Sequence, residues 1–397
     1  MVKFTKKVLS NGLTILHEKR DVPVTTVAIA SRFGAEYEKE SEKGISHVIE
    51  HLCFKGTDKR SAKEISSEIE KIGGILNAFT HEEVTLYHAK LPSKHMNVAL
   101  DVLFDIYFNS NFPEEEMNKE IKVICEEIKM RKDNPRVYVC DRLKQSLYEK
   151  PFGLNISGDD KTILALTRKD IVEKHKAKYC PANSVLCVVG NNSFSEVMKF
   201  VEKFKFPKNI TLEKSQTPKK INLTSEEKRP GLEQANLAMG FHFPIGSSKE
   251  RYAAQLFNSI LGDGMSSKLF LEVREKLGLV YAIKSDFDVG RDYGYLLIYA
   301  GTDKSKVKQV IDIVSKEFKK MENISKEELE EAKRQIVGNY LIESEGSEEC
   351  VVNLIMEEIL DKADKYYQFE KNIKKVGLEE VRTLARNSKF SYSVLSP

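Results

Sequence analysis

The sequence lacks several features that would assign it to a specialised class of protein. Its 397 residues include no tryptophan, no apolar run long enough to span a bilayer, and no CxxC pair among the six cysteines. The missing apolar run argues against a transmembrane protein. Scattered cysteines favour free thiols in a reducing compartment over a disulfide framework. The net charge of +3, from 63 basic and 60 acidic residues, argues against nucleic-acid or membrane partners.

The first twenty residues, MVKFTKKVLSNGLTILHEKR, contain only short apolar pieces. They lack the continuous apolar core of a secretory signal, and we therefore expect a cytoplasmic location. The Asn11-Gly12 pair lies between two strand-like segments. It predicts a β-hairpin at the start of the fold.

The chain is longer than one hydrophobic core usually serves, so we expect at least two domains. Apolar periodicity predicts helices at about 45–55, 61–72, 94–108 and 113–132. A strand-like stretch, ILNAFTHEEVTLYHAKL, follows the second of these helices, and SVLCVVG predicts a buried strand further on. Because strands and helices are mixed and some strands pair as hairpins, the predicted fold class is α+β.

The middle of the chain has the composition of a linker. Residues 206–222, FPKNITLEKSQTPKKIN, lose helical periodicity and are rich in Pro, Thr, Ser and Lys. We predict an N-terminal domain over 1–210, a linker over 211–222 and a C-terminal domain over 223–397.

The second half of the chain resembles the first, which indicates an internal duplication. The segment EIEKIGGILNAFT at 68–80 aligns with EVREKLGLVYAIK at 272–284, and EEEMNKEIKVI at 114–124 aligns with KEELEEAKRQI at 326–336. The copies differ in one set of polar residues, which only the first half keeps. The aligned pairs are His47 and Ala253, Glu50 and Leu256, His51 and Phe257, and Glu127 and Asn339.

The polar set begins with the pentapeptide HVIEH at 47–51, in a chain that has only eight histidines. On a helix, positions four apart share one face, so His47 and His51 could bind one metal ion. A nearby carboxylate, Glu50, could take a proton from a metal-activated water. HxxEH is the signature of one class of zinc peptidases. The alternative is a surface helix that carries two unrelated histidines.

A third ligand could come from the predicted helix at 113–132. Glu120 and Glu127 are seven residues apart, so they share one face of that helix. The surrounding segment IKVICEEIKM is rather apolar, which favours a partly enclosed position for both carboxylates. The alternative is an exposed acidic face.

At these residues the sequence resembles the inverted-zincin metallopeptidases, the family of pitrilysin, insulysin and the mitochondrial processing peptidase. The resemblance covers nearly the whole chain and is closest to short prokaryotic members that are similar to the processing peptidase. It is carried by four segments and by the family's glutamate ligand, which falls 76 residues after the second histidine, at Glu127. The segments are GISHVIEHLCFKGT, AKEISSEIEKIGGILNAFTHEEVTLYHAKL, FPEEEMNKEIKVICEEIKM and LFLEVREKLGLVYAIKSDF.

The resemblance implies a set of metal-site roles. It implies that His47, His51 and Glu127 bind one zinc ion per chain and that Glu50 is the general base. Glu120 matches a second acidic residue that supports a zinc-binding histidine. Glu83 matches an acidic residue in a nearby sequence segment of the family, and we expect it, like Glu120, to support the metal ligands without binding the metal.

The resemblance also implies residues that bind substrate. Asn77 and Ala78 match an edge strand that pairs with the substrate backbone. Arg274 and Tyr281, in VREKLGLVY, match a pair that holds the substrate and stabilises the tetrahedral oxyanion. The implied fold has two homologous domains in tandem, each a mixed, mostly antiparallel sheet packed with helices. Only the first domain would bind zinc.

We therefore predict a zinc-dependent endopeptidase that cleaves peptides or unfolded segments. The resemblance implies a clamshell chamber formed by a homodimer, with Arg274 and Tyr281 supplied by the partner chain. Two alternatives remain: a catalytic subunit of a heteromeric processing peptidase, and a non-catalytic structural or binding homologue.

Overall fold

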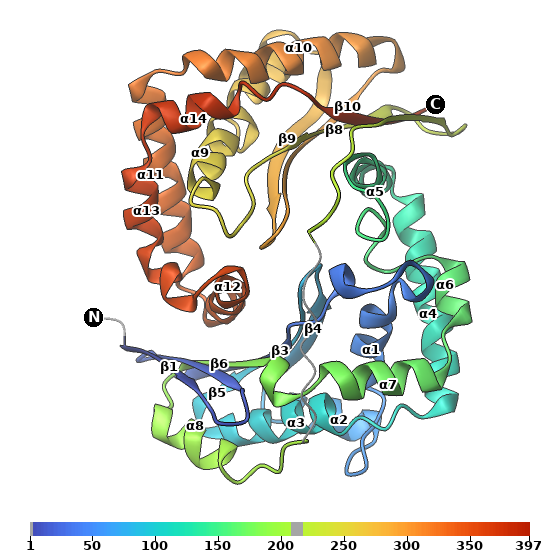
Figure 1. Ribbon diagram of the computed structural model, residues 1–397, viewed down its shortest axis with the longest axis vertical. Helices are drawn as coiled ribbons and strands as arrows, with labels where there is room; N and C mark the ends of the chain where they lie inside the picture. Colours follow the sequence, from blue (N-terminus) through green and yellow to red (C-terminus); the bar gives the residue numbers. More distant parts are fainter. Residues whose placement is uncertain (1–2, 208–216) are drawn as a thin grey trace. The chain divides into compact units, whose positions relative to one another are not determined.

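The computed structural model describes residues 3–207 and 217–397, which form two compact units. The first unit comprises residues up to 128 together with 155–207 and 343–366. The second comprises 129–154, 217–342 and the chain from 367 onward. Both units are mixtures of helices and strands (Figure 1).

The first unit is built on a six-stranded sheet in which only the β2–β6 pair is parallel. In sheet order its strands are β1 (Lys3–Val8), β2 (Thr14–Lys19), β6 (Ser184–Gly190), β3 (Val24–Ser31), β5 (Thr85–Pro92) and β4 (Ile75–Thr80). The predicted N-terminal hairpin is confirmed, because β1 pairs antiparallel with β2 across the Asn11-Gly12 turn. The edge strand β4 pairs with β5 alone within the described residues.

Both faces of this sheet are covered, which explains why β6 is one continuous apolar run. Helix α3 (Met96–Phe108) packs on β3 and β5, where Val27 and Ile29 enter the main core. Helix α12 (Ser347–Leu360) packs on β3 and β6. Its Ser347 hydroxyl forms a hydrogen bond of 2.8 Å with the hydroxyl of Thr26, which lies on the other face of β3.

The second unit repeats this arrangement with five strands. In sheet order they are β7 (Thr224–Lys228), β11 (Ser391–Ser396), β8 (Ala235–His242), β10 (Gly294–Thr302) and β9 (Val280–Val289). Here too a single pair, β7 with β11, is parallel, and β9 is the edge equivalent to β4. Helix α5 (Pro135–Leu147) packs on β8 and β11, and α9 (Arg251–Gly262) contacts β9. The matching topology agrees with an internal duplication, and the α+β class is confirmed.

The two units exchange one helix each. Helix α5 follows the first half of the chain but packs on the second sheet, and α12 follows most of the second half but packs on the first sheet. The predicted domains, 1–210 and 223–397, are continuous segments and do not show this exchange. Part of the predicted linker, residues 208–216, lies outside the described residues.

The four predicted helices of the first half are present. They are α1 (Ile45–Cys53), α2 (Ala62–Glu70), α3, and α4 (Glu114–Asp133). The strand-like stretch after α2 is two strands, β4 and β5, joined by a turn at 81–84. The remaining α-helices are α6 (Asp160–Ala165), α7 (Arg168–Lys178), α8 (Phe194–Val201), α10 (Val307–Lys320), α11 (Lys326–Glu343), α13 (Phe369–Lys375) and α14 (Leu378–Leu384).

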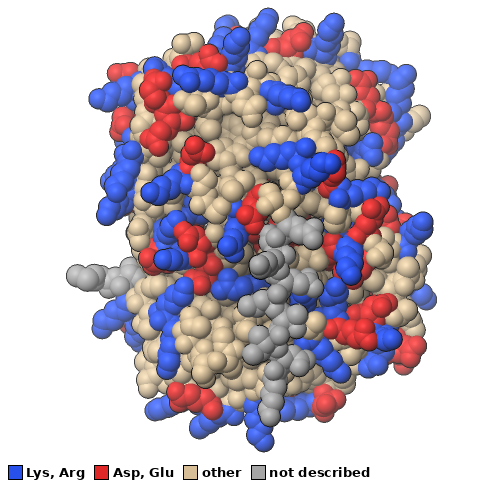
Figure 2. Space-filling model, viewed as in Figure 1, with Lys and Arg blue, Asp and Glu red and all other residues tan. Residues whose placement is uncertain are grey.

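Two surface properties bear on possible partners. Basic and acidic side chains are intermingled on the face shown in Figure 2, which agrees with the near balance of charge in the sequence. In the part of the chain that the structure describes, no helix combines the length and the apolar character needed to cross a bilayer.

Candidate metal centre

Helix α1 begins at a site that is stabilised by a buried carboxylate. Glu38 accepts hydrogen bonds from the backbone N–H groups of Gly44 and Ser46, at 2.9 and 2.7 Å, and from the Ser46 hydroxyl at 2.5 Å. Burial raises the pKa of the Glu38 carboxyl, and the Lys43 ammonium, 3.6 Å away, acts against that rise. A negative charge at a helix N-terminus is favourable, so this contact fixes where α1 starts. Gly44 has φ +96°, a conformation that favours glycine.

The two faces of α1 divide its residues by polarity. The residues of α1 that face the first core include Ile45, Val48, Ile49 and Leu52, and the same core includes Ile121, Ile124 and Ile128 of α4. This shared core fixes α4 beside α1. His47, Glu50 and His51 therefore lie on the face of α1 that the core does not cover, and they are half-buried.

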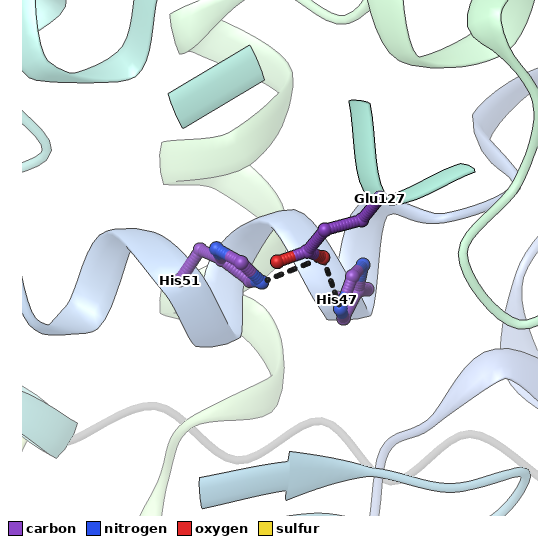
Figure 3. A group of neighbouring side chains, drawn as sticks. All are labelled: His47, His51 and Glu127. Carbon is purple, nitrogen blue, oxygen red and sulfur yellow. Dashed lines mark ion pairs between the residues drawn. The ribbon is translucent and has the colours of Figure 1, made fainter. Parts of the chain in front are cut away.

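The side chains of His47, His51 and Glu127 converge (Figure 3). Oε2 of Glu127 lies 3.8 Å from Nε2 of His47 and 3.5 Å from Nε2 of His51. One donor atom from each residue falls within 4.8 Å of the others. Zinc bonds of about 2.1 Å place the donors of a tetrahedral site roughly 3.5 Å apart. The spacing and the two-imidazole, one-carboxylate donor set therefore fit a zinc ion.

Glu120 contacts the far side of the His51 ring. Its Oε2 lies 3.1 Å from Nδ1 of His51. Because a carboxylate only accepts hydrogen bonds, Nδ1 carries the proton and the lone pair of Nε2 faces Glu127. The two carboxylates of α4 thus hold opposite nitrogens of one imidazole, as their seven-residue spacing allows.

Glu50 is outside the three-residue group, and its carboxylate meets the edge strand β4. Oε2 of Glu50 accepts a hydrogen bond of 2.5 Å from the hydroxyl of Thr80. Burial raises the pKa of the Glu50 carboxyl, while the Thr80 bond and His51 lower it and the charge of Glu127 raises it. A carboxyl with a raised pKa is a better proton acceptor near neutral pH than an ordinary one.

The other predicted residues of the first unit lie on or beside β4. Asn77 and Ala78 are within this edge strand, opposite His88 and Tyr87 of β5, and Asn77 is exposed. Glu83 is fully buried in the turn that follows β4. The structure does not bring Glu83 into the three-residue group, and its supporting role stays a prediction.

Arg274 and Tyr281 belong to the second unit and are both exposed. Arg274 lies in a short π-helix, η5 (Phe270–Lys276), with its guanidinium 4.7 Å from the centre of the Phe270 ring. Tyr281 is 62% exposed near the start of β9, and its hydroxyl donates to Asp303 at 3.2 Å. Both side chains are therefore accessible to a ligand.

Sequence reasoning missed three residues that support this centre: Glu38, Thr80 and Lys55. Lys55 forms an ion pair with Glu120, with Nζ 2.7 Å from Oε1. Its position four residues after His51 was a possible signal, because a helix over the predicted range 45–55 would place both side chains on one face. Nothing local in the sequence identifies Glu38 or Thr80, whose contacts depend on the tertiary fold.

Comparison with known proteins gives the family. Residues 13–160 match the family model described as "Insulinase (Peptidase family M16)", and residues 165–336 match "Peptidase M16 inactive domain". A Bacillus subtilis protein named "Uncharacterized zinc protease YmxG" is 34% identical over 98% of this chain and 97% of its own length. This chain belongs to the insulinase peptidase family. The resemblance predicted from the sequence is confirmed.

A further relative and a solved structure agree. A Rickettsia felis protein named "Uncharacterized zinc protease" is 36% identical over 85% of this chain and 83% of its own length. The crystal structure of a protease from Helicobacter pylori shares the fold, with a TM-score of 0.92, 24% identity and full coverage of both chains. The fold of two tandem domains is therefore confirmed. Membership of the family supports a zinc metallopeptidase. Among the described residues, the one group of side chains that could hold a metal lies in the first unit, which agrees with the "inactive domain" description that residues 165–336 match.

Proposed function

We propose that this protein is a zinc-dependent endopeptidase in which His47, His51 and Glu127 hold the metal. The observation that carries the proposal is the convergence of three donor atoms within 4.8 Å, beside a carboxylate that is not one of them. When bound, zinc would supply Lewis-acid polarisation of the scissile carbonyl and a water acidic enough to be deprotonated near neutral pH.

Glu50 is the proposed general base. Its carboxylate takes a proton from the attacking water and passes it to the nitrogen of the leaving amine. The hydrogen bond from Thr80 orients the Glu50 carboxylate. Glu120 orients the His51 ring through Nδ1.

The edge of β4 is the proposed site for the substrate backbone. An extended peptide can add to an open sheet edge by main-chain hydrogen bonds, and Asn77 and Ala78 lie on that edge. This mode accepts peptides and unfolded segments, because a folded protein offers few free extended stretches. We propose that Arg274 and Tyr281 of a second chain in a homodimer bind the carbonyl oxygen and stabilise its negative charge.

One assay tests the activity. The purified protein is incubated with a mixed peptide pool, with and without a chelator, and the products are identified by mass spectrometry. We expect internal cleavage that the chelator abolishes and added zinc restores. If no peptide is cleaved in a zinc-dependent way, the proposal is wrong.

A mixing experiment tests the dimer. His51→Ala and Arg274→Ala variants are each inactive in the proposed scheme, because each lacks one part of every site. Mixed under conditions that exchange subunits, they should regain part of the activity, since one composite site per heterodimer is intact. If exchange is demonstrated by mass and no activity returns, Arg274 does not act from the partner chain.

A further inference from the structure

We infer that Lys55 is a positioning residue for the metal ligand His51 and that it acts through Glu120. The inference deepens the proposed function and rests on it for the identity of the metal. It concerns a contact that the ligand motif does not include, because Lys55 lies two residues beyond the end of α1.

Four contacts alternate between residues 47–55 and the carboxylates of α4. His47, His51 and Lys55 are spaced by four residues, whereas Glu127 and Glu120 are spaced by seven. Oε2 of Glu127 lies 3.8 Å from Nε2 of His47 and 3.5 Å from Nε2 of His51. Oε2 of Glu120 lies 3.1 Å from Nδ1 of His51, and Oε1 of Glu120 lies 2.7 Å from Nζ of Lys55. Each carboxylate therefore bridges two successive members of the series His47, His51 and Lys55.

The two oxygens of Glu120 have different partners. Oε2 takes the Nδ1 proton of His51, and Oε1 takes the Lys55 ammonium. A carboxylate held at both oxygens cannot rotate freely, so the plane of Glu120 and the ring of His51 are fixed together. The orientation of that ring decides whether Nε2 faces Glu127 and hence a bound metal.

Burial gives Lys55 a second effect. The Glu120 side chain is only 10% exposed and that of Lys55 is 27% exposed. A buried carboxylate is costly unless a partner charge compensates for the lost hydration. The ammonium of Lys55 supplies that charge without competing for the oxygen that His51 uses.

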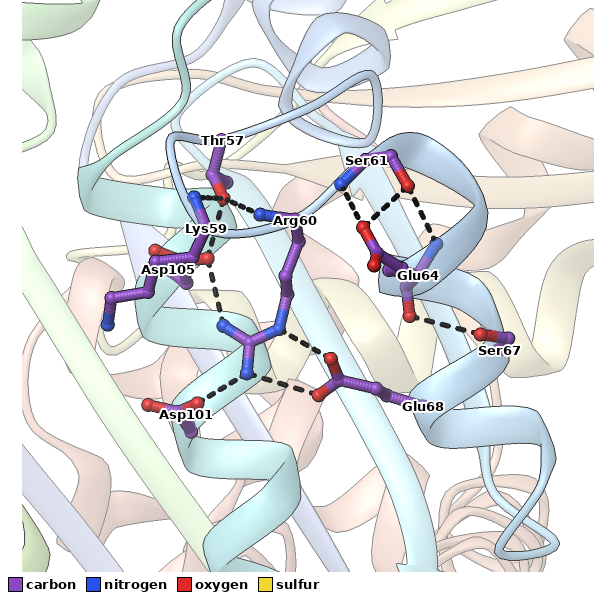
Figure 4. Close-up of polar contacts among 9 residues, drawn as sticks. All are labelled: Thr57, Lys59, Arg60, Ser61, Glu64, Ser67, Glu68, Asp101 and Asp105. Carbon is purple, nitrogen blue, oxygen red and sulfur yellow. Dashed lines mark hydrogen bonds and ion pairs between the residues drawn. The ribbon is translucent and has the colours of Figure 1, made fainter.

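The backbone that carries Lys55 is well anchored. The Lys55 N–H donates to the carbonyl of Leu52 at 3.0 Å. The following loop is tied to α3, because the hydroxyl of Thr57 donates to Asp105 at 2.7 Å and Arg60 binds the same carboxylate at 2.9 Å (Figure 4). A fixed backbone lowers the entropic cost of holding a long lysine side chain in one contact.

The same loop provides a matched control. Lys59 is exposed, and its side chain points away from the guanidinium of Arg60 (Figure 4). Removal of the Lys59 charge changes the loop's net charge as much as removal of the Lys55 charge does. A difference between the two variants therefore reports the contact with Glu120 and not the local charge.

The test measures zinc affinity by competition with a chromophoric chelator, on the full chain and without substrate. We expect Lys55→Met to weaken zinc binding about tenfold, as is usual for residues that support a ligand. Lys55→Arg should recover most of the affinity, and Lys59→Met should match the wild type. Glu120→Gln should weaken binding, and adding Lys55→Met to it should cause little further loss, because the two residues act in series.

Two results would overturn the inference: zinc affinity of Lys55→Met within twofold of wild type, or fully additive losses in the double variant. Melting of the zinc-free proteins separates positioning from a general loss of stability. If Lys55→Met lowers that melting temperature by more than about 5 °C, Lys55→Gln replaces it and the same criteria apply. Unchanged affinity in an active peptidase refutes only the role of Lys55, whereas wild-type protein that binds zinc but cleaves no peptide refutes only the proposed function.

Discussion

The two units share the topology of five strands but place different residues on equivalent helices. In the first unit, α1 carries His47, Glu50 and His51 on a half-buried face. At the aligned positions of α9 in the second unit, Ala253, Leu256 and Phe257 are 2%, 0% and 0% exposed. Phe257 packs against Phe243 and Phe318, with ring centres 5.2 and 5.0 Å away.

This difference teaches what the scaffold itself requires. In the second unit, apolar side chains fill the equivalent position and extend the core, so the fold does not depend on polar residues there. In the first unit the same position holds groups that are costly to bury and that fit a metal. The comparison therefore separates residues kept for chemistry from residues kept for folding, and four changes test it.

The largest expected effect is on catalysis. Glu50→Gln keeps the shape of the side chain but removes the proposed base, and we expect peptide hydrolysis to fall by about a thousandfold, within the usual range for general-base catalysis. Zinc content should remain at the wild-type level. The two measurements are initial rates on a defined peptide and metal analysis of the dialysed protein. Full turnover by this variant would contradict the role of Glu50.

The next effect is on metal binding. His51→Ala removes one of three proposed ligands, so zinc affinity should fall by more than the hundredfold that supporting residues typically contribute. The aligned change Phe257→Ala, in the second unit, should leave zinc affinity unchanged. Chelator competition on both variants checks this pair, and equal losses would show that the effect is not local to the first unit.

A third change makes the second unit resemble the first. Leu256→Glu puts a carboxylate at a fully buried site where the structure offers a hydrophobic core. We expect the free energy of unfolding to fall by about 3 kcal/mol or more, with no gain of metal binding, because an unpaired buried charge is among the most destabilising substitutions. Denaturant titration gives the stability. A stable variant would mean that this position is more tolerant than its packing indicates.

The smallest effect concerns pH. Among the described residues of the first unit, burial lowers the pKa of His17, His88 and His175, and that of His175 falls to about 4. Because the folded-state pKa lies below the unfolded value of 6.5, the neutral imidazole is favoured in the folded state. The stability it contributes is complete above pH 6.5 and is lost as the pH falls towards 4.

At pH 5 the predicted loss from His175 alone is about 2 kcal/mol relative to neutral pH. His175→Gln should remove that part of the pH dependence. Hydrogen exchange at pH 7 and pH 5, resolved by segment, should show a larger loss of protection in the first unit than in the second. In the described residues of the second unit, burial lowers the pKa of one histidine, His242, compared with three in the first unit. Equal losses in both units would contradict the prediction.

The sequence was sufficient for features that depend on nearby residues. The Asn11-Gly12 turn placed the first hairpin, and apolar periodicity predicted a helix over 113–132, where α4 spans Glu114–Asp133. The convergence of His47, His51 and Glu127 was predicted from two local spacings and the family resemblance. The boundary between β4 and β5 was not predicted, because the turn at 81–84 contains neither glycine nor proline.

Other features depend on contacts between distant segments, which no local pattern reveals. Thr80 meets Glu50 only because β4 lies beside α1. Glu38 meets the first turn of α1 only because the preceding loop is buried. The exchange of α5 and α12 leaves no mark in either helix, because an apolar helix face does not identify which sheet it will cover.

That exchange has a consequence for how the chain can be divided. Severing it between the repeats would leave a piece ending near residue 207 without α12, so the apolar surface of β3 and β6 would be open to water. The other piece would lose α5 from β8 and β11 in the same way. Although the sequence consists of two similar repeats, neither repeat contains all the helices of its own unit. Each repeat therefore depends on the other for the helix that covers one face of its sheet.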